Sequence, residues 1–168
     1  MKLLVVGGGG REHAIIRKLK ENPEAEQIFA LPGNGGIARD AVCVDIAAKD
    51  IDGIVKFAVE NKIDFAVVAP DDPLALGAVD ALEAVGVPAF GPKKNAARIE
   101  ASKVFAKELM QKYGIPTAKC RVFTDADSAR AYLKTAPLPA VIKADAWPWA
   151  RASSSPRPMR KPTPPSTI

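Results

Sequence analysis

The sequence predicts an α/β protein with an open, mostly parallel sheet and helices on both of its faces. Short apolar runs of strand length alternate with amphipathic segments of helix length from residue 2 to residue 90. This alternation is typical of parallel strands joined by helical crossovers. The first run, residues 2–6, is apolar after Lys2 without polar alternation, which indicates a strand buried on both faces.

The expected elements follow one another at regular spacing. After the first strand, four glycines at residues 7–10 turn the chain into a helix over residues 11–20, whose apolar residues share one face. Further strands are expected at residues 27–31, 41–45, 65–68 and 87–90, and further helices at residues 51–60 and 74–84. Past Gly91 and Pro92, the start of a second domain is expected, with helices at 95–99 and 102–113, a strand at 121–123, a helix at 125–134 and a strand at 140–144. Ser102 is the expected N-cap of the second of these helices.

Composition excludes several classes of function. Residues 147–168 hold four of the 24 basic residues and no acidic residue, so the rest of the chain has 20 basic against 19 acidic residues. That balance predicts no nucleic-acid partner. No apolar run approaches the ~18 residues of a membrane span, and no signal-peptide core is present, so we expect a cytoplasmic protein without a membrane partner. Cys43 and Cys120 lack the spacing of a zinc site, no metal ligands are assigned, and both cysteines are expected to be buried.

The chain changes character after Asp145. Residues 147–168 contain both tryptophans and six of the 15 prolines, a composition expected to stay disordered. Because Trp has the single codon TGG, reading one base out of register turns Trp147-Pro148 into Ala and Trp149-Ala150 into Gly. The shifted frame gives a Leu-Ala-Leu-Gly-Lys pattern entering a hydrophobic strand. We therefore expect an out-of-frame tail caused by a lost base near Ala146, the alternative being a genuine Pro/Ser/Arg-rich tail.

The glycine-rich turn after the first strand is the first candidate site. Glycines let the backbone approach a ligand, and the amides that begin a helix attract phosphate. The dinucleotide fingerprint does not fit, because its last glycine falls on Glu12 and no acidic residue ends the second strand. Arg11, Glu12 and His13 crowd the first helical turn. Either Glu12 complements the helix dipole while Arg11 and His13 are solvated, or the three are binding groups at the carboxyl end of a strand.

Two more loops are expected on the same edge of the sheet. Residues 32–36 and 69–74 follow the second and the 65–68 strand, so three Gly-rich or polar loops converge there, which favours a ligand site. Asp71 or Asp72 either caps a helix or binds an amine or ribose hydroxyl. Lys143, inside an apolar strand, either contacts a phosphate or points into water from an edge strand.

Together these segments resemble the phosphoribosylamine–glycine ligase family, the glycinamide ribonucleotide synthetases of purine biosynthesis in the ATP-grasp superfamily. The matching strings are Val-Gly-Gly-Gly-Gly-Arg-Glu-His-Ala, Pro-Gly-Asn-Gly-Gly, Pro-Asp-Asp-Pro-Leu, Phe-Gly-Pro, Ile-Glu-Ala-Ser-Lys, Gly-Ile-Pro-Thr-Ala and Val-Ile-Lys-Ala-Asp. They occur in the family's order across residues 1–145. In this family Lys-Ala-Asp is followed by Gly-Leu-Ala-x-Gly-Lys-Gly-Val, which the shifted frame of the tail reproduces.

The resemblance implies a domain organisation and a set of site residues. It implies a Rossmann-like, pre-ATP-grasp substrate domain over residues 1–100, then a linker helix and the incomplete start of an ATP-grasp domain over residues 101–146. The implied contacts to phosphoribosylamine come from Gly9, Gly10, Arg11, Glu12, His13, Asn34, Asp71 and Pro73, and those to the nucleotide from Lys107 and Lys143. Asp71 stands where the family has Glu, and Ala101 where it has Gly.

The implied reaction is the ATP-dependent joining of glycine to phosphoribosylamine through a glycyl phosphate, with Mg²⁺ or Mn²⁺ as cofactor. The family's metal ligands are expected beyond this chain, so the polypeptide is expected to be inactive alone. Two alternatives remain: a non-catalytic nucleotide-binding α/β domain, and another ATP-grasp carboxylate–amine ligase, of the biotin carboxylase or aminoimidazole ribonucleotide carboxylase type. The Gly-Arg-Glu-His and Pro-Gly-Asn-Gly strings argue against the second alternative.

Overall fold

The computed structural model describes residues 1–143 and 153–154. The chain divides into two compact units, Met1–Ala106 and Lys107–Ile168, which are described separately below. No helix among the described residues combines the length and the apolarity needed to cross a membrane.

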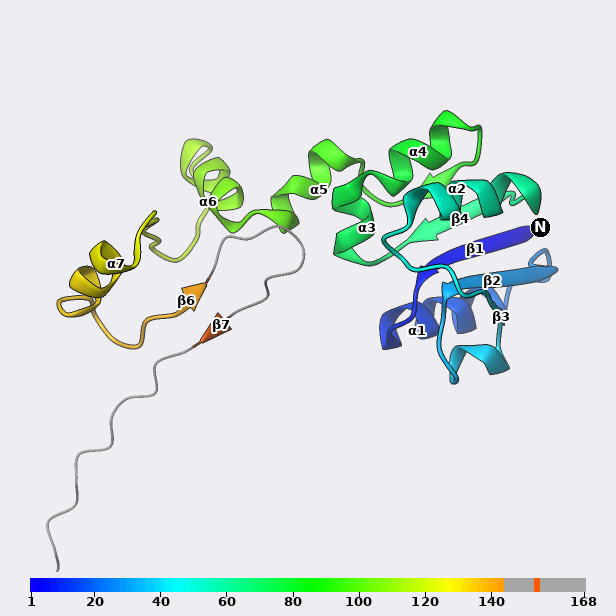
Figure 1. Cartoon of the computed structure of the whole chain (residues 1–168), viewed down its shortest axis with the longest axis horizontal. Helices are drawn as coiled ribbons and strands as arrows, with labels where there is room; N and C mark the ends of the chain where they lie inside the picture. The colour runs from blue at the N-terminus through cyan, green and yellow to red at the C-terminus, as the bar shows by residue number, and fades with distance from the viewer. Residues whose placement is uncertain (144–152, 155–168) are drawn as a thin grey trace, which may run out of the picture. The chain divides into compact units, whose positions relative to one another are not determined.

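The first unit is built on a five-stranded parallel sheet. Its strands are β1 (Lys2–Gly7), β2 (Gln27–Pro32), β3 (Val42–Cys43), β4 (Phe65–Val68) and β5 (Ala89–Phe90). Their order across the sheet is β3-β2-β1-β4-β5, and every neighbouring pair is parallel (Figure 1). The expected open parallel sheet is therefore confirmed, with the first strand at its centre.

Each face of this sheet buries its own apolar cluster. Leu4 and Val6 of β1 belong to the cluster that includes Ile54 of α2 (Ile51–Glu60) and Leu82 of α4 (Ala78–Ala84). Leu3, Val5, Ile28 and Ala30 point the other way and meet Ile16 of α1 (Gly10–Leu19) and Ile37 of η1 (Ile37–Arg39). Successive strand residues face opposite sides, so burial on both sides explains the unbroken apolar run. Burying one such Leu or Ile stabilises the fold by about 1.5–3 kcal/mol.

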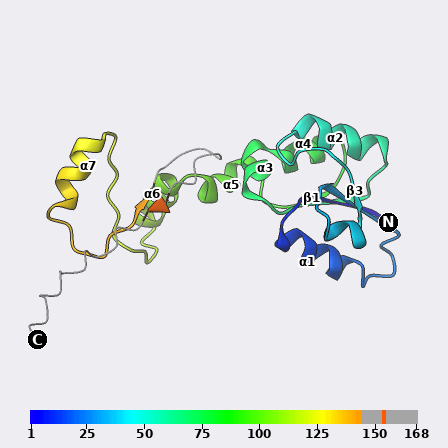
Figure 2. The same ribbon diagram turned by 60° about the horizontal axis from the view of Figure 1, so that its bottom comes forward.

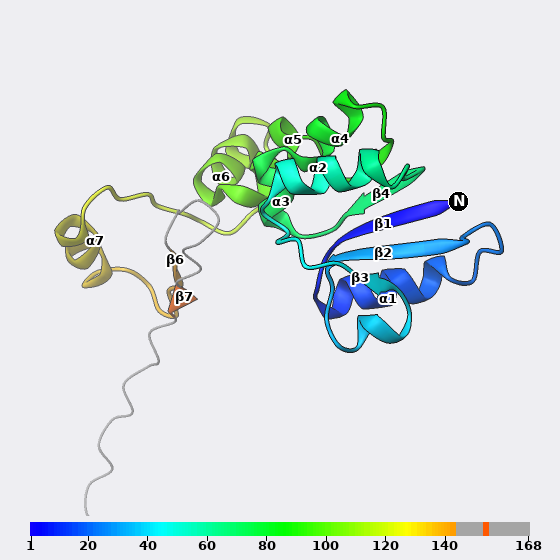
Figure 3. The same cartoon turned by 45° about the vertical axis from the view of Figure 1, so that its right-hand side comes forward.

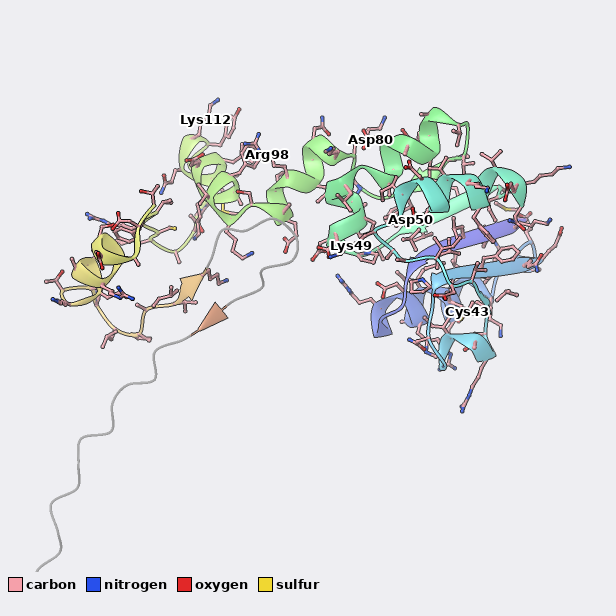
Figure 4. The ribbon with its side chains drawn as sticks, in the orientation of Figure 1. Cys43, Lys49, Asp50, Asp80, Arg98 and Lys112 are labelled. Atoms are coloured by element: carbon pink, nitrogen blue, oxygen red, sulfur yellow. The ribbon has the colours of Figure 1, made fainter. Side chains whose placement is uncertain are left out.

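Helices cover both faces, as expected. Figures 2 and 3 show α1 on one side of the sheet and α2 and α4 on the other. Asp50, labelled in Figure 4, begins α2 by accepting a hydrogen bond from the Gly53 amide at 3.0 Å. Asp80 of α4 accepts one at 2.8 Å from the amide of Lys94, where α5 (Lys94–Ala101) begins.

The helix expected over residues 74–84 differs from the structure. Two helices occupy this region, α3 (Asp71–Leu76) and α4, separated by Gly77 with φ +97°. Helix α3 begins earlier than expected because Pro70 provides an extended N-cap. Pro73 is tolerated in its first turn, because the N–H groups of a first turn have no partner within the helix. A left-handed residue ends a helix, and glycine adopts that conformation without a Cβ penalty.

The chain passes into the second unit through α6 (Lys103–Lys112). The Ser102 hydroxyl accepts a hydrogen bond from the Phe105 amide at 3.1 Å, which confirms the expected cap. In the second unit α7 (Ala126–Leu133) follows Asp125, which caps it by accepting from the Ser128 amide at 2.8 Å. Strand β6 (Ile142–Lys143) pairs antiparallel with β7 (Ser153–Ser154).

Two further expectations, the strand at residues 121–123 and the burial of both cysteines, are wrong. Residues 121–123 form no strand; Phe123 instead packs on Tyr132 of α7 with ring centroids 5.3 Å apart, and the Arg121 guanidinium lies 5.0 Å from the same ring. Cys120 is exposed and Cys43 is only partly buried. The expected disordered, out-of-frame tail lies outside the described residues except for Ser153 and Ser154.

Candidate functional site

Three loops meet at the carboxyl edge of the sheet, where the strand order reverses between β1 and β4. The chain runs from β1 to β2 on one side and later returns to β4 on the other. A reversal of this kind opens a crevice in which open α/β sheets bind ligands. Gly7, with φ +123°, ends β1 so close to the loop after β4 that a Cβ there would lie 2.7 Å from Glu12 Cγ and 2.8 Å from Pro70 Cγ. The loops after β1 and β4 are therefore in contact.

The loops after β1 and β2 are joined by hydrogen bonds. The Gly33 amide donates to the Gly7 carbonyl at 3.2 Å, and the Asn34 side-chain amide donates to the Gly8 carbonyl at 2.7 Å. The side-chain Oδ1 of Asn34 accepts from the amides of Gly36 and Ile37 at 2.7 and 2.9 Å. Asn34 thus fixes its own loop and the glycine loop together. We call the three joined loops, residues 7–13, 32–36 and 69–73, the rim.

Glu12 is the one charged residue in the buried core of the described chain, with 3% of its surface exposed. Its Oε2 accepts a hydrogen bond at 2.6 Å from the Gly9 amide, which lies just before α1. Its Oε1 is buried without a hydrogen-bond partner among the described residues, and the Arg11 Nε lies 4.0 Å away. Glu12 lies in the first turn of α1, where its charge complements the helix dipole, while the neighbouring Arg11 side chain is exposed.

His13 takes part in an ion-pair cluster that sequence spacing gave no reason to expect. Its Nε2 lies 2.9 Å from Oδ2 of Asp40, and Oδ1 of the same carboxylate accepts from Lys20 Nζ at 2.8 Å. The hydrogen bonds from Lys20 and then from His13 lower the pKa of Asp40 from 3.8 to about 2. Asp40 stands 27 residues after His13 and follows η1, an element absent from the expected order, so sequence patterning missed it.

The loop after β4 places its carboxylates at the start of α3. Asp71 and Asp72 lie in the first turn, and Pro70 rather than either aspartate is the N-cap. Asp72 pairs with Lys49 at 2.8 Å, ahead of α2 (Figure 4). Asp71 is partly buried, whereas Pro73 is buried completely. The negative charges of Asp71 and Asp72 interact favourably with the dipole at the N-terminus of α3.

The two lysines expected to contact a nucleotide belong to the second unit. The Lys107 ammonium donates to Thr117 Oγ1 at 2.7 Å and to the Ala118 carbonyl at 2.9 Å. Lys143 is exposed on β6, so its charge points into water rather than into an apolar layer. No group of three or more potential metal ligands occurs among the described residues.

The rim exposes groups suited to an anionic, polyhydroxylated ligand. Gly9, Gly10, Arg11 and Asn34 are exposed, and the Arg11 side chain is 68% exposed. Helix-terminal amides and an arginine complement phosphate. A shallow cavity of about 560 Å³ lies elsewhere, along the outer side of α1, lined by Ala14, Arg17, Lys18, Lys20, Glu21 and Asp40. We place the site at the rim, because the cavity is open and shares no residue with the rim loops.

Comparisons with known proteins match both halves of the chain. Residues 1–100 match the family model described as the phosphoribosylglycinamide synthetase N domain, and residues 101–151 match that of its ATP-grasp (A) domain. A phosphoribosylamine–glycine ligase of Listeria monocytogenes is 53% identical over 86% of this chain and 35% of its own length. The corresponding ligase of Caldanaerobacter subterraneus is 50% identical, with the same shares covered. The chain thus spans about a third of the length of these relatives.

Solved structures show the same fold. The phosphoribosylamine–glycine ligase of Thermotoga maritima is 29% identical over 92% of this chain and 36% of that one, with a TM-score of 0.68. The biotin carboxylase domain of a Hydrogenobacter thermophilus 2-oxoglutarate carboxylase gives 0.67 at 23% identity, covering 93% of this chain and 37% of that one. At that identity the second likeness concerns the fold alone.

Proposed function

This chain belongs to the phosphoribosylglycinamide synthetase family, and from that premise we propose that its rim binds phosphoribosylamine for an ATP-dependent ligase. The reaction joins glycine to the ribosylamine and yields glycinamide ribonucleotide, ADP and phosphate. The observation that supports this proposal best is the union of three loops at the sheet's reversal point, held together through Gly7, Gly8 and Asn34.

We assign the rim residues to different parts of the ligand. The Gly10 amide and the Arg11 guanidinium take the 5′-phosphate, because they offer a donor and positive charge. Gly9, whose own amide donates to Glu12, lets the phosphate approach the backbone closely. Asn34 and Asp71 take ribose hydroxyls, and His13 takes a donor group of the sugar or its amine. Glu12 and Pro73 are buried and support the rim from below the ligand. Glu12 does so by holding the Gly9 amide in place.

ATP enters the proposal as the second substrate. Lys107 and Lys143 are the proposed contacts to its phosphates, since ammonium groups balance phosphate charge. Mg²⁺ supplies charge neutralisation in this class of phosphoryl transfer. The described residues contain no cluster that would hold that ion, so no step is assigned to it here.

The proposed reaction has two successive steps. ATP transfers its γ-phosphoryl group to the glycine carboxylate, which gives glycyl phosphate and ADP. The ribosylamine nitrogen then attacks that carbonyl, loses a proton, forms the amide and releases phosphate. The acyl phosphate must be shielded from water. The rim contributes by fixing the ribose phosphate, so that the amine is held in one orientation. Its attack on the glycyl phosphate then no longer costs translational and rotational entropy.

Calorimetric titration of the 168-residue chain with glycinamide ribonucleotide tests the binding proposal. We expect Arg11→Ala to weaken binding at least about tenfold, because a charge-assisted contact to phosphate is lost. Arg17→Ala is the matched control, since Arg17 is exposed at the other end of the same helix. Equal affinity of the Arg11 variant and the unmodified chain would refute the phosphate assignment. Tighter binding of a dinucleotide than of the ribonucleotide would favour a nucleotide-binding domain instead.

A further inference from the structure

Asp40 connects the segment after η1 to His13 of α1 and to Lys20, the C-cap of that helix. One carboxylate oxygen faces His13 Nε2 at 2.9 Å and the other accepts from Lys20 Nζ at 2.8 Å. The carboxylate is 23% exposed and the imidazole 31% exposed, so water screens this cluster only in part. The charged groups around the imidazole in this cluster are Asp40 and, through it, Lys20.

An ionised carboxylate fixes which nitrogen of a neutral histidine carries the proton. A carboxylate can only accept hydrogen bonds, and the pKa of Asp40 of about 2 keeps it ionised at neutral pH. The proton between the two groups therefore belongs to Nε2. The neutral ring then has Nδ1 as a hydrogen-bond acceptor.

The Nδ1 edge of the ring faces the rim. A Cβ built on Gly36 would lie 3.4 Å from His13 Cε1, 3.5 Å from His13 Nδ1 and 3.1 Å from Asn34 Oδ1. The acceptor nitrogen is thus beside the loop that follows β2, whereas Asp40 faces the other nitrogen, Nε2. Because Gly36 has no side chain, nothing larger than its α hydrogen stands at that point.

We propose that Asp40 is a positioning residue that holds His13 in the Nε2–H tautomer, so that Nδ1 accepts a hydrogen bond from an N–H or O–H donor of the bound ribosylamine. Lys20 pairs with the other carboxylate oxygen, Oδ1, which does not face the imidazole. The ligand half of this inference rests on the function proposed above. The tautomer half does not depend on it.

The sequence makes the test direct, because His13 is its only histidine. We would record long-range ¹H–¹⁵N spectra of the ¹⁵N-labelled 168-residue chain at about pH 8.5, where an ordinary imidazole is neutral. The unmodified chain should show a protonated, slowly exchanging Nε2 and an unprotonated Nδ1. Asp40→Ala should lose the protected Nε2 proton and mix the tautomers, whereas Asp40→Asn, which keeps an acceptor oxygen, should retain the signal in part.

Addition of glycinamide ribonucleotide tests the second half. The Nδ1 resonance should move in the unmodified chain, and Asp40→Ala should weaken binding about fivefold to tenfold, the value of one ordinary hydrogen bond. Lys20→Met is the matched control because it removes the other partner of the carboxylate. It should keep the Nε2 proton and most of the affinity.

The outcomes separate this inference from the proposed function. Binding with an unmoved Nδ1 resonance and unchanged affinity of Asp40→Ala would overturn the inference and leave the function standing. Equal losses in Asp40→Ala and Lys20→Met would overturn it as well, because the effect would not pass through His13. No binding by the unmodified chain would overturn the function and the ligand half together, and the ligand-free spectra would still decide the tautomer.

Discussion

At the scale of single residues, Glu12 combines burial with an incomplete set of hydrogen bonds. One oxygen holds the Gly9 amide at 2.6 Å, and the other lacks a partner among the described residues. A buried carboxylate without full hydrogen bonding costs free energy. Its side chain also fills the space beside Gly7 and against the loop after β4. Glu12 is therefore better understood as a support for two rim loops than as a surface charge.

We expect Glu12→Ala to destabilise the first unit by about 1–3 kcal/mol, because the Gly9 amide loses its acceptor and the space beside Gly7 empties. Glu21→Ala is the matched control, since Glu21 is exposed and pairs with Lys18 at the surface. It should change stability by less than about 0.5 kcal/mol. Urea unfolding followed by circular dichroism measures both. Equal midpoints for the two variants would contradict the supporting role.

The low pKa of Asp40 predicts a pH-dependent contribution to stability. Its pKa is about 2 in the folded chain against the ordinary value of 3.8, because Lys20 and His13 hydrogen-bond to it. A lowered carboxylate pKa stabilises the fold above the unfolded value and loses that effect as pH falls through the folded value. Asp40→Asn should therefore be less stable than the unmodified chain at pH 7, and the gap should close between about pH 4 and pH 2. A gap independent of pH over that window, in urea titrations, would contradict this account.

At the scale of elements, Gly77 decides how the chain between β4 and β5 is divided. Its left-handed φ of +97° stops α3, and its amide donates to the carbonyls of Pro73 and Leu74 at 3.1 and 3.0 Å. A Cβ at this position would meet nothing nearer than Lys94 Cδ at 3.5 Å. The glycine is thus required by the backbone and not by crowding.

Gly77→Ala should destabilise the first unit by about 1–2 kcal/mol through backbone strain alone. Gly35→Ala is the control, because Gly35 has open space around it and no positive φ, and its cost should stay within about 0.5 kcal/mol. Thermal unfolding of the two variants distinguishes them. If Gly77→Ala were neutral, a continuous helix through this region would be accessible, as the sequence pattern had suggested.

Most elements of the first unit were predictable because their patterns are local. β4 and α2 fall on the expected residues, and β1, β2 and α1 differ by one or two. The break at Gly77 was missed because apolar periodicity continues across it. The absence of a strand at residues 121–123 was missed because Phe123 packs on Tyr132 instead of joining a sheet, while Val122 is exposed. Asn34 and Arg11 were predictable as rim residues from strand ends, but Asp40 meets His13 only through the folded path of η1.

At the scale of the whole molecule, the two units have separate parts in the proposed reaction. The rim lies in the first unit, and Lys107 and Lys143 lie in the second. The chain matches about a third of the length of its relatives. In the proposed function, binding of the ribose phosphate needs only the rim, whereas phosphoryl transfer needs charge stabilisation around a triphosphate.

We therefore expect the purified 168-residue chain to bind glycinamide ribonucleotide without catalysing glycine-dependent ADP release from ATP and phosphoribosylamine. A coupled ADP assay measures the second property, and the Listeria monocytogenes relative serves as the positive control. Substantial turnover by the 168-residue chain would show that two lysines and the rim suffice for the chemistry.

The coding DNA offers an independent check on the last part of the chain. The relatives align with 86% of this chain. One base out of register, the codons of Trp147 and Trp149 read as Ala and Gly. We expect the alternate frame to continue as an open frame with a Gly-Lys loop and a hydrophobic strand. Sequencing the gene across the Asp145 and Ala146 codons tests this, and an early stop in that frame would refute it.

The central place of β1 has a consequence for synthesis on the ribosome. β1 is made first but pairs with β2 on one edge and with β4 on the other, so that second edge stays unsatisfied until residue 68 has left the exit tunnel. An unpaired apolar edge can template pairing with other chains. During this interval of synthesis β1, which is buried in the folded chain, is the strand most prone to pair with other chains. Chaperone engagement should therefore be greatest before β4 emerges.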